Sequence, residues 1–509
     1  IRFIAHDPFF YATTDQGASF PPREALGSVK GILQRSALGR WGTMSNDTSG
    51  TAVVGTVDAL TYANGTLFVG GRITQAGGTA TRGVAMWFPS TERWGTFGGT
   101  TTPGGAYNVQ SLAYAPWGSL YLSGEFGAFG GTASRHLAQW NGAFGSLVGG
   151  TANGRVDTIR LSPGGTLFLG GQFTQVGGTT APRVARWRAN AFGSLVGQAA
   201  GTVDSDVYAL AFGLDGRLFF TGAFGSAGGT AMSRIGQWNG AFGSMLAGLQ
   251  WTEAGYQGNA LAIGLNGLVA VGGYFGTAGG VAGTLVSQWN GVSFSAMGAG
   301  LGTSALNQVW ALLTDPETGA IYATGRFTQS GPIAIPNGFA RWNGYQWIPL
   351  DITLPITESV GIVNALALAN DRRFFIGGEF AGTAHGASVT QVFNTGRTEA
   401  YPVWRARLPG SGTARVYQLI NTLTGDAIYF NYVMQAGEEI VLDLTQTSRT
   451  LTSSFLGNIF RAILPGSNLT SLRLMPGTNY FSFFSDNDTL VSSLSWRPRS
   501  WSADAGTAL

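Results

Sequence analysis

Residue types that could catalyse a reaction or bind a metal are few in this sequence and widely spaced. The three histidines are His6, His136 and His385, and none of them belongs to an HExxH pattern. Because imidazole ligands and bases need partners at fixed spacing, these positions favour histidines in turns or facing solvent. No GxSxG segment is present, although a dispersed Ser-His-Asp arrangement stays open. We therefore predict no metal site and no catalytic residue.

Two further segments have compositions that suggest a ligand. Residues 298–303, GAGLGT, are rich in glycine but depart from GxGxxG, and no GK[ST] phosphate loop occurs. Residues 485–488, SDND, are acidic, but they lack the glycine and the distal glutamate of an EF-hand loop. The expectation is therefore an acidic turn, with no bound nucleotide, calcium or other cofactor.

Polar and aromatic residues that suit ligand binding lie in segments that vary between otherwise repetitive stretches. Variable loops on a rigid scaffold commonly carry binding sites. The candidate ligand-binding residues are Tyr107, Asp204, Asp206, Trp251, Glu253 and Tyr256. The last three suit a sugar ring, because aromatic rings stack on it and a carboxylate accepts hydrogen bonds from its hydroxyls. The alternative is that Trp251 packs beneath its own loop.

These segments connect copies of one repeated unit. Its first copy runs from Leu67 to Gly78 and is followed by Trp87. The second glycine of each core is Gly71, Gly124, Gly171, Gly222, Gly273, Gly325 and Gly378, at spacings of 53, 47, 51, 51, 52 and 53 residues. A period of this length and regularity indicates a repeat architecture.

Each unit has the pattern of four short strands. In the first unit these are residues 57–60, the apolar run that ends at the glycine pair, a strand that ends at Trp87, and residues 94–97. Asn-Gly dipeptides after the third strand predict tight hairpins. Four antiparallel strands per unit, repeated radially, predict a propeller blade, in which the tryptophan packs between blades. The repeat also resembles kelch-type propeller repeats. The predicted fold class is all-β, with a seven-bladed propeller.

The seventh unit lacks a fourth strand after its third strand, which is expected to end near Phe393. Residues 40–44, RWGTM, match the fourth-strand pattern but precede the first unit. We therefore predict that residues 39–45 pair with the strand that ends near Phe393 and close the ring. The predicted propeller spans residues 38–398.

Overall composition excludes several classes of protein. The formal net charge is +3, and the basic residues are 28 arginines and Lys30, with no run of four or more. This distribution argues against nucleic-acid binding. The absence of cysteine excludes disulfide and Cys-metal scaffolds. No run of 18 apolar residues occurs, and we expect neither a membrane span nor a signal peptide in the sequence given.

The segments that flank the repeats differ from them. Residues 399–509 contain short alternating segments with turn signals at intervals of about ten residues, a pattern typical of a β-sandwich. Motifs occur there in the order Tyr401-Pro402, NTLTG at 421–425, GEEIVLD at 437–443, MPGTN at 475–479 and WRPR at 496–499. This order resembles the C-terminal galectin-like sandwich of siphophage distal tail proteins. Residues 7–11, DPFFY, are similar to the DPFWY that closes the first, ring-forming domain of that family.

The resemblance implies that residues 1–37 pack with a galectin-like sandwich at 399–509, and that the propeller is an inserted module. It also implies a structural virion protein at the tail tip or baseplate, facing the exterior. Expected partners are other tail or baseplate proteins, further copies in a homo-oligomeric ring, and a host-surface glycan or protein.

We expect binding without catalysis, because the central strands are read as Val, Ala and Leu without acids. Two alternatives stay open. A propeller glycosidase or lyase acting on surface polysaccharide would need paired carboxylates facing one cavity. A secreted carbohydrate-binding adhesin would need a signal peptide.

Overall fold

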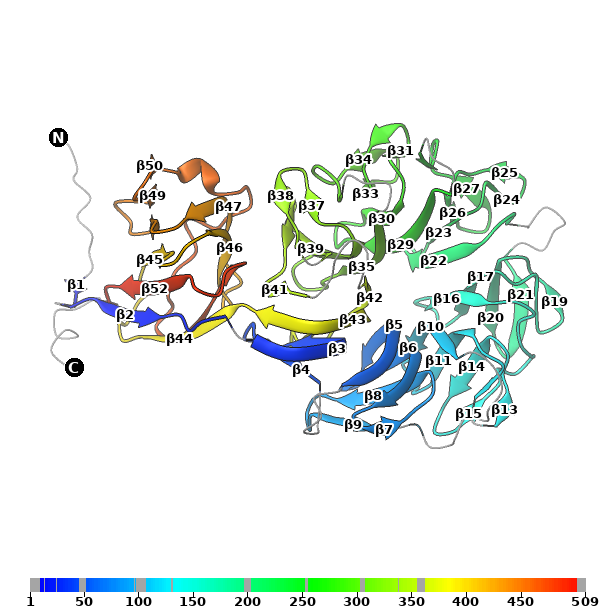
Figure 1. Ribbon diagram of the computed structural model, residues 1–509. Coiled ribbons are helices and arrows are strands. Elements are labelled where there is room, and N and C mark those ends of the chain that lie inside the picture. The colour runs from blue at the N-terminus through cyan, green and yellow to red at the C-terminus, as the bar shows by residue number, and fades with distance from the viewer. Residues whose placement is uncertain are drawn as a thin grey trace.

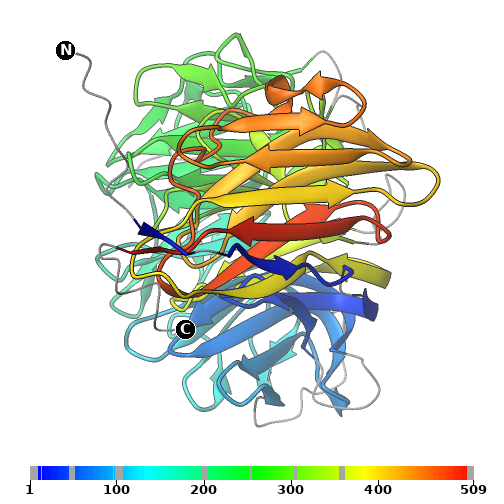
Figure 2. The ribbon, with the colours of Figure 1, turned by 90° about the vertical axis from the view of Figure 1, so that its left-hand side faces the viewer.

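The chain folds into two bodies built of β-strands, a propeller and a sandwich (Figures 1 and 2). The computed structural model describes residues 10–12, 14–23, 25–44, 52–95, 97, 107–129, 131–195, 203–251, 255–302, 307–336, 338–354 and 362–500. Within these ranges the helical structure is a single 3-10 turn, η1 (Phe460–Ala462), and no helix is long and apolar enough to cross a membrane.

The first three blades are four-stranded antiparallel sheets, each beginning with its innermost strand. They are β5 (Val53–Ala63), β6 (Thr66–Ala76), β8 (Val84–Phe88), β9 (Arg93–Gly95); β10 (Asn108–Tyr114), β11 (Leu120–Glu125), β14 (Leu137–Trp140), β15 (Phe144–Gly145); and β16 (Val156–Leu161), β17 (Leu167–Gly171), β20 (Val184–Arg188), β21 (Ala191–Ser194).

Blades four to six repeat the same order. They are β22 (Val207–Phe212), β23 (Leu218–Gly222), β26 (Ile235–Trp238), β27 (Phe242–Ser244); β29 (Gln257–Ile263), β30 (Val269–Tyr274), β33 (Val286–Trp289), β34 (Phe294–Ala296); and β35 (Gln308–Thr314), β36 (Ile321–Arg326), β39 (Phe339–Trp342), β40 (Trp347–Pro349).

A small hairpin extends each of these blades between its second and third strands, which the sequence analysis did not predict. Its strands are β7 (Thr79–Ala80, paired with β6), β12 (Ala128–Phe129) and β13 (Thr132–Ala133), β18 (Gln175–Val176) and β19 (Thr179–Thr180), β24 (Ser226–Ala227) and β25 (Thr230–Ala231), β31 (Thr277–Ala278) and β32 (Val281–Ala282) with β28 (Leu249–Gln250), and β37 (Gln329–Ser330) and β38 (Ile333–Ala334).

The seventh blade combines strands from both ends of the repeat region. It consists of β42 (Ile362–Leu368), β43 (Phe374–Gly386), β3 (Ala25–Arg35) and β4 (Trp41–Thr43), and β41 (Ile352–Thr353) pairs with the far end of β43. An N-terminal segment therefore does complete this blade, but it supplies two strands. The predicted pairing of residues 39–45 with the strand near Phe393 is wrong, because β4 pairs with β3.

The strand near Phe393 is β44 (Ser388–Asn394), and it pairs with β51 (Gly477–Ser485) of the sandwich. In the repeat, Phe393 occupies the position of the inter-blade tryptophans, yet the Phe393 side chain is 59% exposed. The strand pairing thus places residues 25–35 with the propeller and residues 388–394 with the sandwich, in contrast to the boundaries predicted at 38 and 398.

The seventh blade packs against the first. Ile32 of β3 and Phe375 of β43 lie in one buried cluster with Val57 of β5. Figure 1 shows the innermost strands in chain order around the centre, from β5 to β42.

Four units carry a glycine pair, and in the other three the glycine follows Ser123, Thr221 or Thr324. The two positions of the pair have separate steric causes. A Cβ at the second glycine would lie 1.9–2.3 Å from a carbonyl oxygen of the blade's own first strand, as at Gly325, where the oxygen belongs to Gln308. A Cβ at the first glycine would approach a valine of the next blade, as at Gly272 beside Val309. The pair therefore allows close contact both within and between blades.

The sandwich consists of two sheets. One contains β2 (Gln16–Ser19), β52 (Val491–Trp496), β45 (Pro402–Arg407), β48 (Glu439–Asp443), β49 (Thr450–Ser453) and β50 (Gly457–Asn458), and the other contains β44, β51, β46 (Thr413–Asn421) and β47 (Ala427–Gln435). Trp404 stacks on Phe430 and contacts Phe483 in the core between them.

Two N-terminal strands belong to this sandwich. β1 (Phe10–Tyr11) pairs with β53 (Arg499–Ser500), and β2 pairs with β52. Residues 1–9 of the segment predicted to pack with the sandwich lie outside the described residues.

A buried carboxylate ties the N-terminal strands of the seventh blade to the segment that follows blade six. Asp351 is 2% exposed and accepts hydrogen bonds from the Arg35 guanidinium, at 2.9 and 3.0 Å from Nε, and from Trp41 Nε1 at 3.0 Å. Because β41 starts at the next residue, this contact fixes three segments that are distant in sequence.

The glycine argument predicts a large loss of stability for Gly325→Ala, because the new methyl would overlap the Gln308 carbonyl. We expect the free energy of unfolding to fall by more than about 2 kcal/mol. Gly145→Ala is the matched control, since nothing lies within 4 Å of a Cβ there. Equal thermal melting temperatures for the two variants would contradict the steric role.

The buried ion pair predicts that Asp351→Asn costs on the order of 3–5 kcal/mol, because Arg35 then keeps a buried charge without its counter-ion. Glu317→Gln breaks a comparable pair with Arg372, in which both side chains are more than half exposed. That control should change stability by less than about 1 kcal/mol. Chemical denaturation of both variants checks the difference.

Candidate functional site

One residue of each innermost strand is displaced from the regular pairing by a β-bulge. The bulge falls at the same place in all seven blades, between the first and third residues of the Val-x-Ala-Leu-like segment. The displaced residues, here called the bulge ring, are Asp58, Gln110, Asp157, Tyr208, Asn259, Trp310 and Asn364. Because a bulge redirects a side chain, seven residues of different type converge on one place.

The bulge ring lies between two adjoining cavities. One, of about 450 Å³, extends along the innermost strands of all seven blades. The other, here called the mouth, has a volume of about 480 Å³. The mouth is also lined by Arg72, Asn108, Arg155, Gln257, Ile362 and Glu379. All seven ring residues line both cavities, so they separate the central channel from its mouth.

Two carboxyl groups in the ring have unusual acidity. Burial raises the pKa of Asp58 to about 6, against the opposing effects of Arg72 and of a 2.8 Å hydrogen bond from Asn364. Burial likewise raises the pKa of Asp157 to about 7, although Arg155 Nε donates a 2.6 Å hydrogen bond to Asp157 Oδ1. Both groups are therefore partly protonated near neutral pH.

Several buried polar atoms of the ring have no hydrogen-bond partner within the described part of the chain. They are Asp157 Oδ2, Gln110 Oε1, Trp310 Nε1 and Asp58 Oδ2, the last of which lies 3.7 Å from Arg72 Nε. The Asp157 side chain is only 7% exposed. Unpaired buried polar atoms are costly, so a site of this kind is suited to water or a ligand that supplies the missing hydrogen bonds.

The ring corrects one expectation from the sequence. The central strands were read as lacking acids, yet Asp58 and Asp157 are in β5 and β16. The apolar residues of these strands conceal the acids in the sequence, because the residue in the bulge does not follow the alternation of apolar and polar residues along the strand. The signal that could have found the site is the variable second position of an otherwise constant segment.

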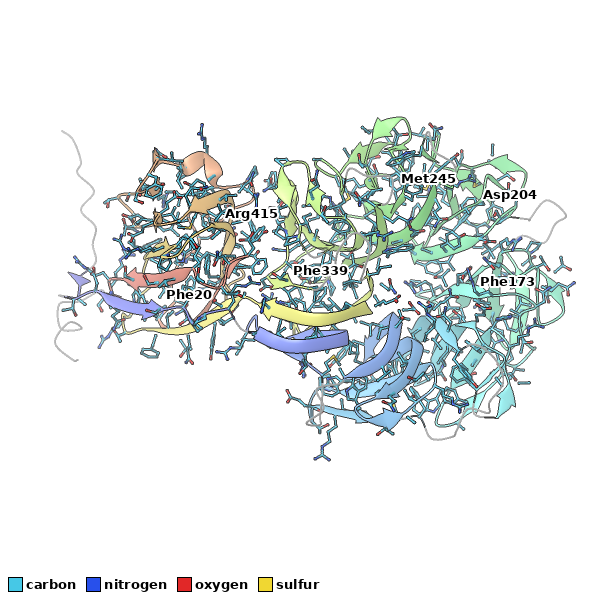
Figure 3. All side chains as sticks on the ribbon, viewed as in Figure 1. Phe20, Phe173, Asp204, Met245, Phe339 and Arg415 are labelled. Atoms are coloured by element: carbon cyan, nitrogen blue, oxygen red, sulfur yellow. The ribbon has the colours of Figure 1, made fainter. Side chains whose placement is uncertain are left out.

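The predicted aspartates have structural contacts. Asp204 accepts hydrogen bonds of 2.9 Å from Gly225 N and Ser226 Oγ, and thereby holds the hairpin of blade four at the outer edge seen in Figure 3. Asp206 pairs with Arg183 at 3.2 Å and accepts a 2.7 Å hydrogen bond from Gln172. It adjoins the ring, since its charge contributes to the raised pKa of Asp157.

The predicted aromatic residues also contact neighbouring side chains. Trp251 stacks on Tyr274 of β30 with ring centroids 5.3 Å apart. The Arg234 guanidinium lies over the Tyr256 ring, with its Cζ atom 4.4 Å from the centroid of that ring.

Tyr107 accepts a 3.3 Å hydrogen bond from Arg82. Glu253 lies outside the described residues, so the proposed grouping with Trp251 and Tyr256 stays a prediction.

The two described histidines have different surroundings, and one of them lies beside the acidic turn at 485–488. His136 Nδ1 is 3.0 Å from Gly124 O, and burial lowers its pKa. His385 Nδ1 is 4.0 Å from Asp488, which also pairs with Arg23 at 3.2 Å. His6 lies outside the described residues. Within the described ranges no group of three His, Cys, Asp or Glu side chains could hold a metal ion.

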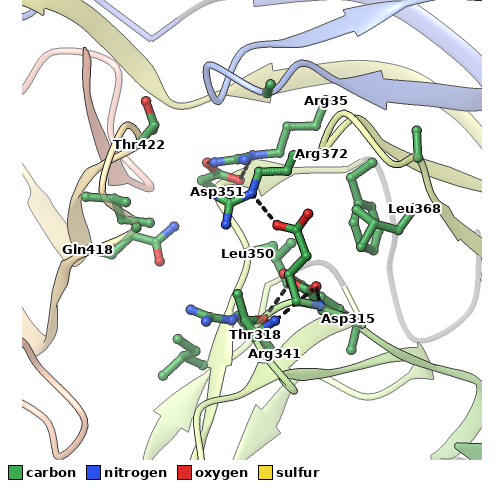
Figure 4. Close-up of a pocket in the computed structure, with 18 of the residues that line it drawn as sticks. Arg35, Asp315, Thr318, Arg341, Leu350, Asp351, Leu368, Arg372, Gln418 and Thr422 are labelled. Atoms are coloured by element: carbon green, nitrogen blue, oxygen red, sulfur yellow. Dashed lines mark hydrogen bonds and ion pairs between the residues drawn. The ribbon is translucent and has the colours of Figure 1, made fainter. Parts of the chain in front are cut away.

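A third cavity, of about 380 Å³, lies between the propeller and the sandwich (Figure 4). Its charged groups are mostly paired: Arg35 with Asp351, and Arg372 with Glu317 at 2.9 Å. Arg341 donates a 2.8 Å hydrogen bond to Tyr429 across the junction. We assign this cavity to the junction between the two bodies.

Comparisons with known proteins give similarities of fold. No protein-family model matches the chain, and no curated protein matches it. Similar solved structures include the extracellular domain of a protein assigned as a hybrid two-component system of B. thetaiotaomicron, with 11% identity, a TM-score of 0.42, and coverage of 78% of this chain and 45% of that one.

Two further similar structures correspond to different activities. The GH74 xyloglucanase from Xanthomonas campestris shares 12% identity at a TM-score of 0.38, over 89% of this chain and 81% of that one. The Dit protein of phage SPP1 shares 12% identity at a TM-score of 0.17, over 35% of this chain and 78% of that one. All three TM-scores are below 0.5, and similarities of this size do not establish a shared function.

The raised pKa of Asp157 predicts a pH-dependent stability. The folded state holds the proton up to about pH 7, whereas the unfolded chain releases it near pH 4, so the free energy of unfolding falls as the pH rises between these values. The full contribution is up to about 4 kcal/mol. Asp157→Asn should remove this part of the slope in denaturation at pH 5 and pH 8. Asp215→Asn is the control, because its side chain is 57% exposed. An unchanged slope in Asp157→Asn would contradict the assignment.

Proposed function

We propose that the chain is a structural virion protein of a tailed phage, located at the tail tip or baseplate. In this proposal the sandwich joins the chain to other tail proteins and to further copies of itself in a ring. The propeller faces outward and contacts a host-surface glycan or protein, or a neighbouring tail protein.

The observation that carries the proposal is the meeting of motifs from the two ends of the chain. Phe10 pairs with Ser500 and Tyr11 with Arg499, so the last two residues of the segment similar to DPFWY lie beside the end of the WRPR segment. Arg499, only 2% exposed, lies over the Tyr401 ring at 5.5 Å. Parts of three motifs that carry the resemblance to distal tail proteins are thus neighbours in space.

The chain path also supports an inserted module. The polypeptide leaves the sandwich after β2 and returns to it at β44, and between them β3 and β43 run side by side as antiparallel partners. A domain whose ends are adjacent can be inserted in a loop without distorting its host. Many copies on a symmetric tail would raise a weak affinity through avidity.

A second candidate is a propeller glycosidase or lyase. The specific observation is that Asp58 and Asp157, both with raised pKa values, line the same cavity. Glycoside hydrolysis uses one protonated and one ionised carboxyl. We propose binding without catalysis, because each acid also faces an arginine that holds it in place: Arg72 lies 3.7 Å from Asp58, and Arg155 hydrogen-bonds Asp157.

Immunogold labelling of purified phage particles that encode this chain tests its location. Antibodies raised against the whole chain should label the distal end of the tail, and antibodies against the major capsid protein serve as the control. Labelling of the capsid, or particles that lack the chain altogether, would contradict the proposal.

Catalysis is tested separately. Incubation of the full chain with host-envelope polysaccharides should release no new reducing ends and no unsaturated products above the level seen with Asp157→Asn. Release by the wild type that is lost in this variant would establish the second candidate.

A further inference from the structure

We propose that the mouth of the central channel, and not the loops between blades, is the ligand site of the propeller, and that it takes an uncharged, hydroxyl-rich ligand, a saccharide. This inference deepens the proposed function. The identification of the saccharide as a host-surface glycan rests on that proposed function.

The site is built by the repeat itself. Each blade contributes one bulge, and the second glycine of each core leaves room for it, because any Cβ there would collide with the carbonyl before the bulge. The flanking positions are nearly constant from blade to blade, whereas the displaced position differs. Since the bulge occurs with seven side chains of five different types, folding does not dictate which residue stands there. Each of the seven nevertheless carries a group able to form hydrogen bonds.

The unpaired atoms indicate what the ligand must supply. Gln110 Oε1 needs a donor and Trp310 Nε1 needs an acceptor, while Asp157 Oδ2 needs a donor when the carboxyl is ionised and an acceptor when it is protonated. A hydroxyl group is both donor and acceptor, so one ligand with several hydroxyls satisfies all three. Asp157, which is more than nine-tenths buried, stands in the wall of the cavity with this oxygen free.

The charges of the mouth disfavour an ionic ligand. Asp58 and Asp157 have Arg72 and Arg155 as neighbours, so the cations are already engaged. A phosphate or nucleic acid requires available arginines or lysines.

Glu379 also lines the mouth, and its carboxylate lies 3.9 Å from Arg72. The other polar side chains are mainly amides: Asn108, Gln110, Gln257, Asn259 and Asn364. Amides donate and accept hydrogen bonds without charge. Tyr208 and Trp310 add aromatic surface to the lining, which suits the apolar face of a sugar ring. The volume of about 480 Å³ lies within the usual range for small-ligand sites.

The test uses the full chain and immobilised neutral and anionic oligosaccharides of one to four sugars, together with fragments of host-envelope polysaccharide. Gln110→Met and Trp310→Phe remove two of the unpaired groups. Gln110→Met keeps the side-chain volume nearly unchanged, and Trp310→Phe keeps an aromatic ring, although a smaller one. Neither atom has a protein partner in the described residues, so the thermal melting temperature should not change. We expect at least a tenfold loss of affinity for a neutral saccharide in each variant.

Gln391→Met is the matched control, because Gln391 is an exposed residue of β44 in the sandwich, and its affinity should equal that of the wild type. The affinity of the wild type should be nearly equal at about 0.05 and 0.5 M NaCl, since no net charge is neutralised on binding. Binding restricted to anionic saccharides, or absent from all of them, would overturn the proposal. Binding that survives both mouth variants but is lost in Trp251→Phe would place the site in the loops and overturn it as well.

These outcomes separate the inference from the proposed function. Saccharide binding at the mouth together with failure of tail labelling would keep the site and reject the virion role. Tail labelling together with failure of saccharide binding would keep the virion role and reject the site.

Discussion

The pairing of β3 with β43 is the contact on which the rest of the molecule depends. These two long strands complete the last blade, lay it against the first, and continue into the sandwich at β2 and β44. The buried Asp351 holds both the Arg35 end of β3 and Trp41 of β4. Closing a ring of seven blades orders a very long loop, whose entropic cost must be met by contacts between residues distant in sequence. The buried, charge-assisted pair of Asp351 and Arg35 lies where the ring closes and therefore helps to offset this entropic cost.

The second constraint is the close packing of the innermost strands. A glycine opposite each bulge is required sterically, and the bulge in turn releases one side chain per blade from the blade packing. The fold thereby keeps its apolar core constant while the seven residues of the ring are free to differ. Function can change at these seven positions without altering the blades, because their side chains line a cavity and do not fill the space between sheets.

The two acidic ring residues show how such a position changes chemistry. Burial makes the ionised form of each carboxyl costly, and the neighbouring arginine only partly compensates for it. The same arrangement can serve recognition of hydroxyl groups or proton transfer. In this chain the surrounding amides and the free acceptor of Asp157 favour recognition. Two of the candidates in the loops are engaged locally, Asp204 by Gly225 and the Tyr256 ring by Arg234.

The sequence by itself determined the all-β class, the sevenfold repeat and the sandwich with its N-terminal strands, because these follow from local periodicity, turn dipeptides and motif order. It did not determine which strand completes the last blade: β3 carries no blade signature, and only pairing across more than 300 residues selects it over β44. It also placed the candidate site in the loops, since an alternating pattern conceals a bulge. Only the tertiary structure brings Asp58, Asp157 and Trp310 together, because each is positioned by the strand pairing of its own blade and by the closure of the ring around a common axis.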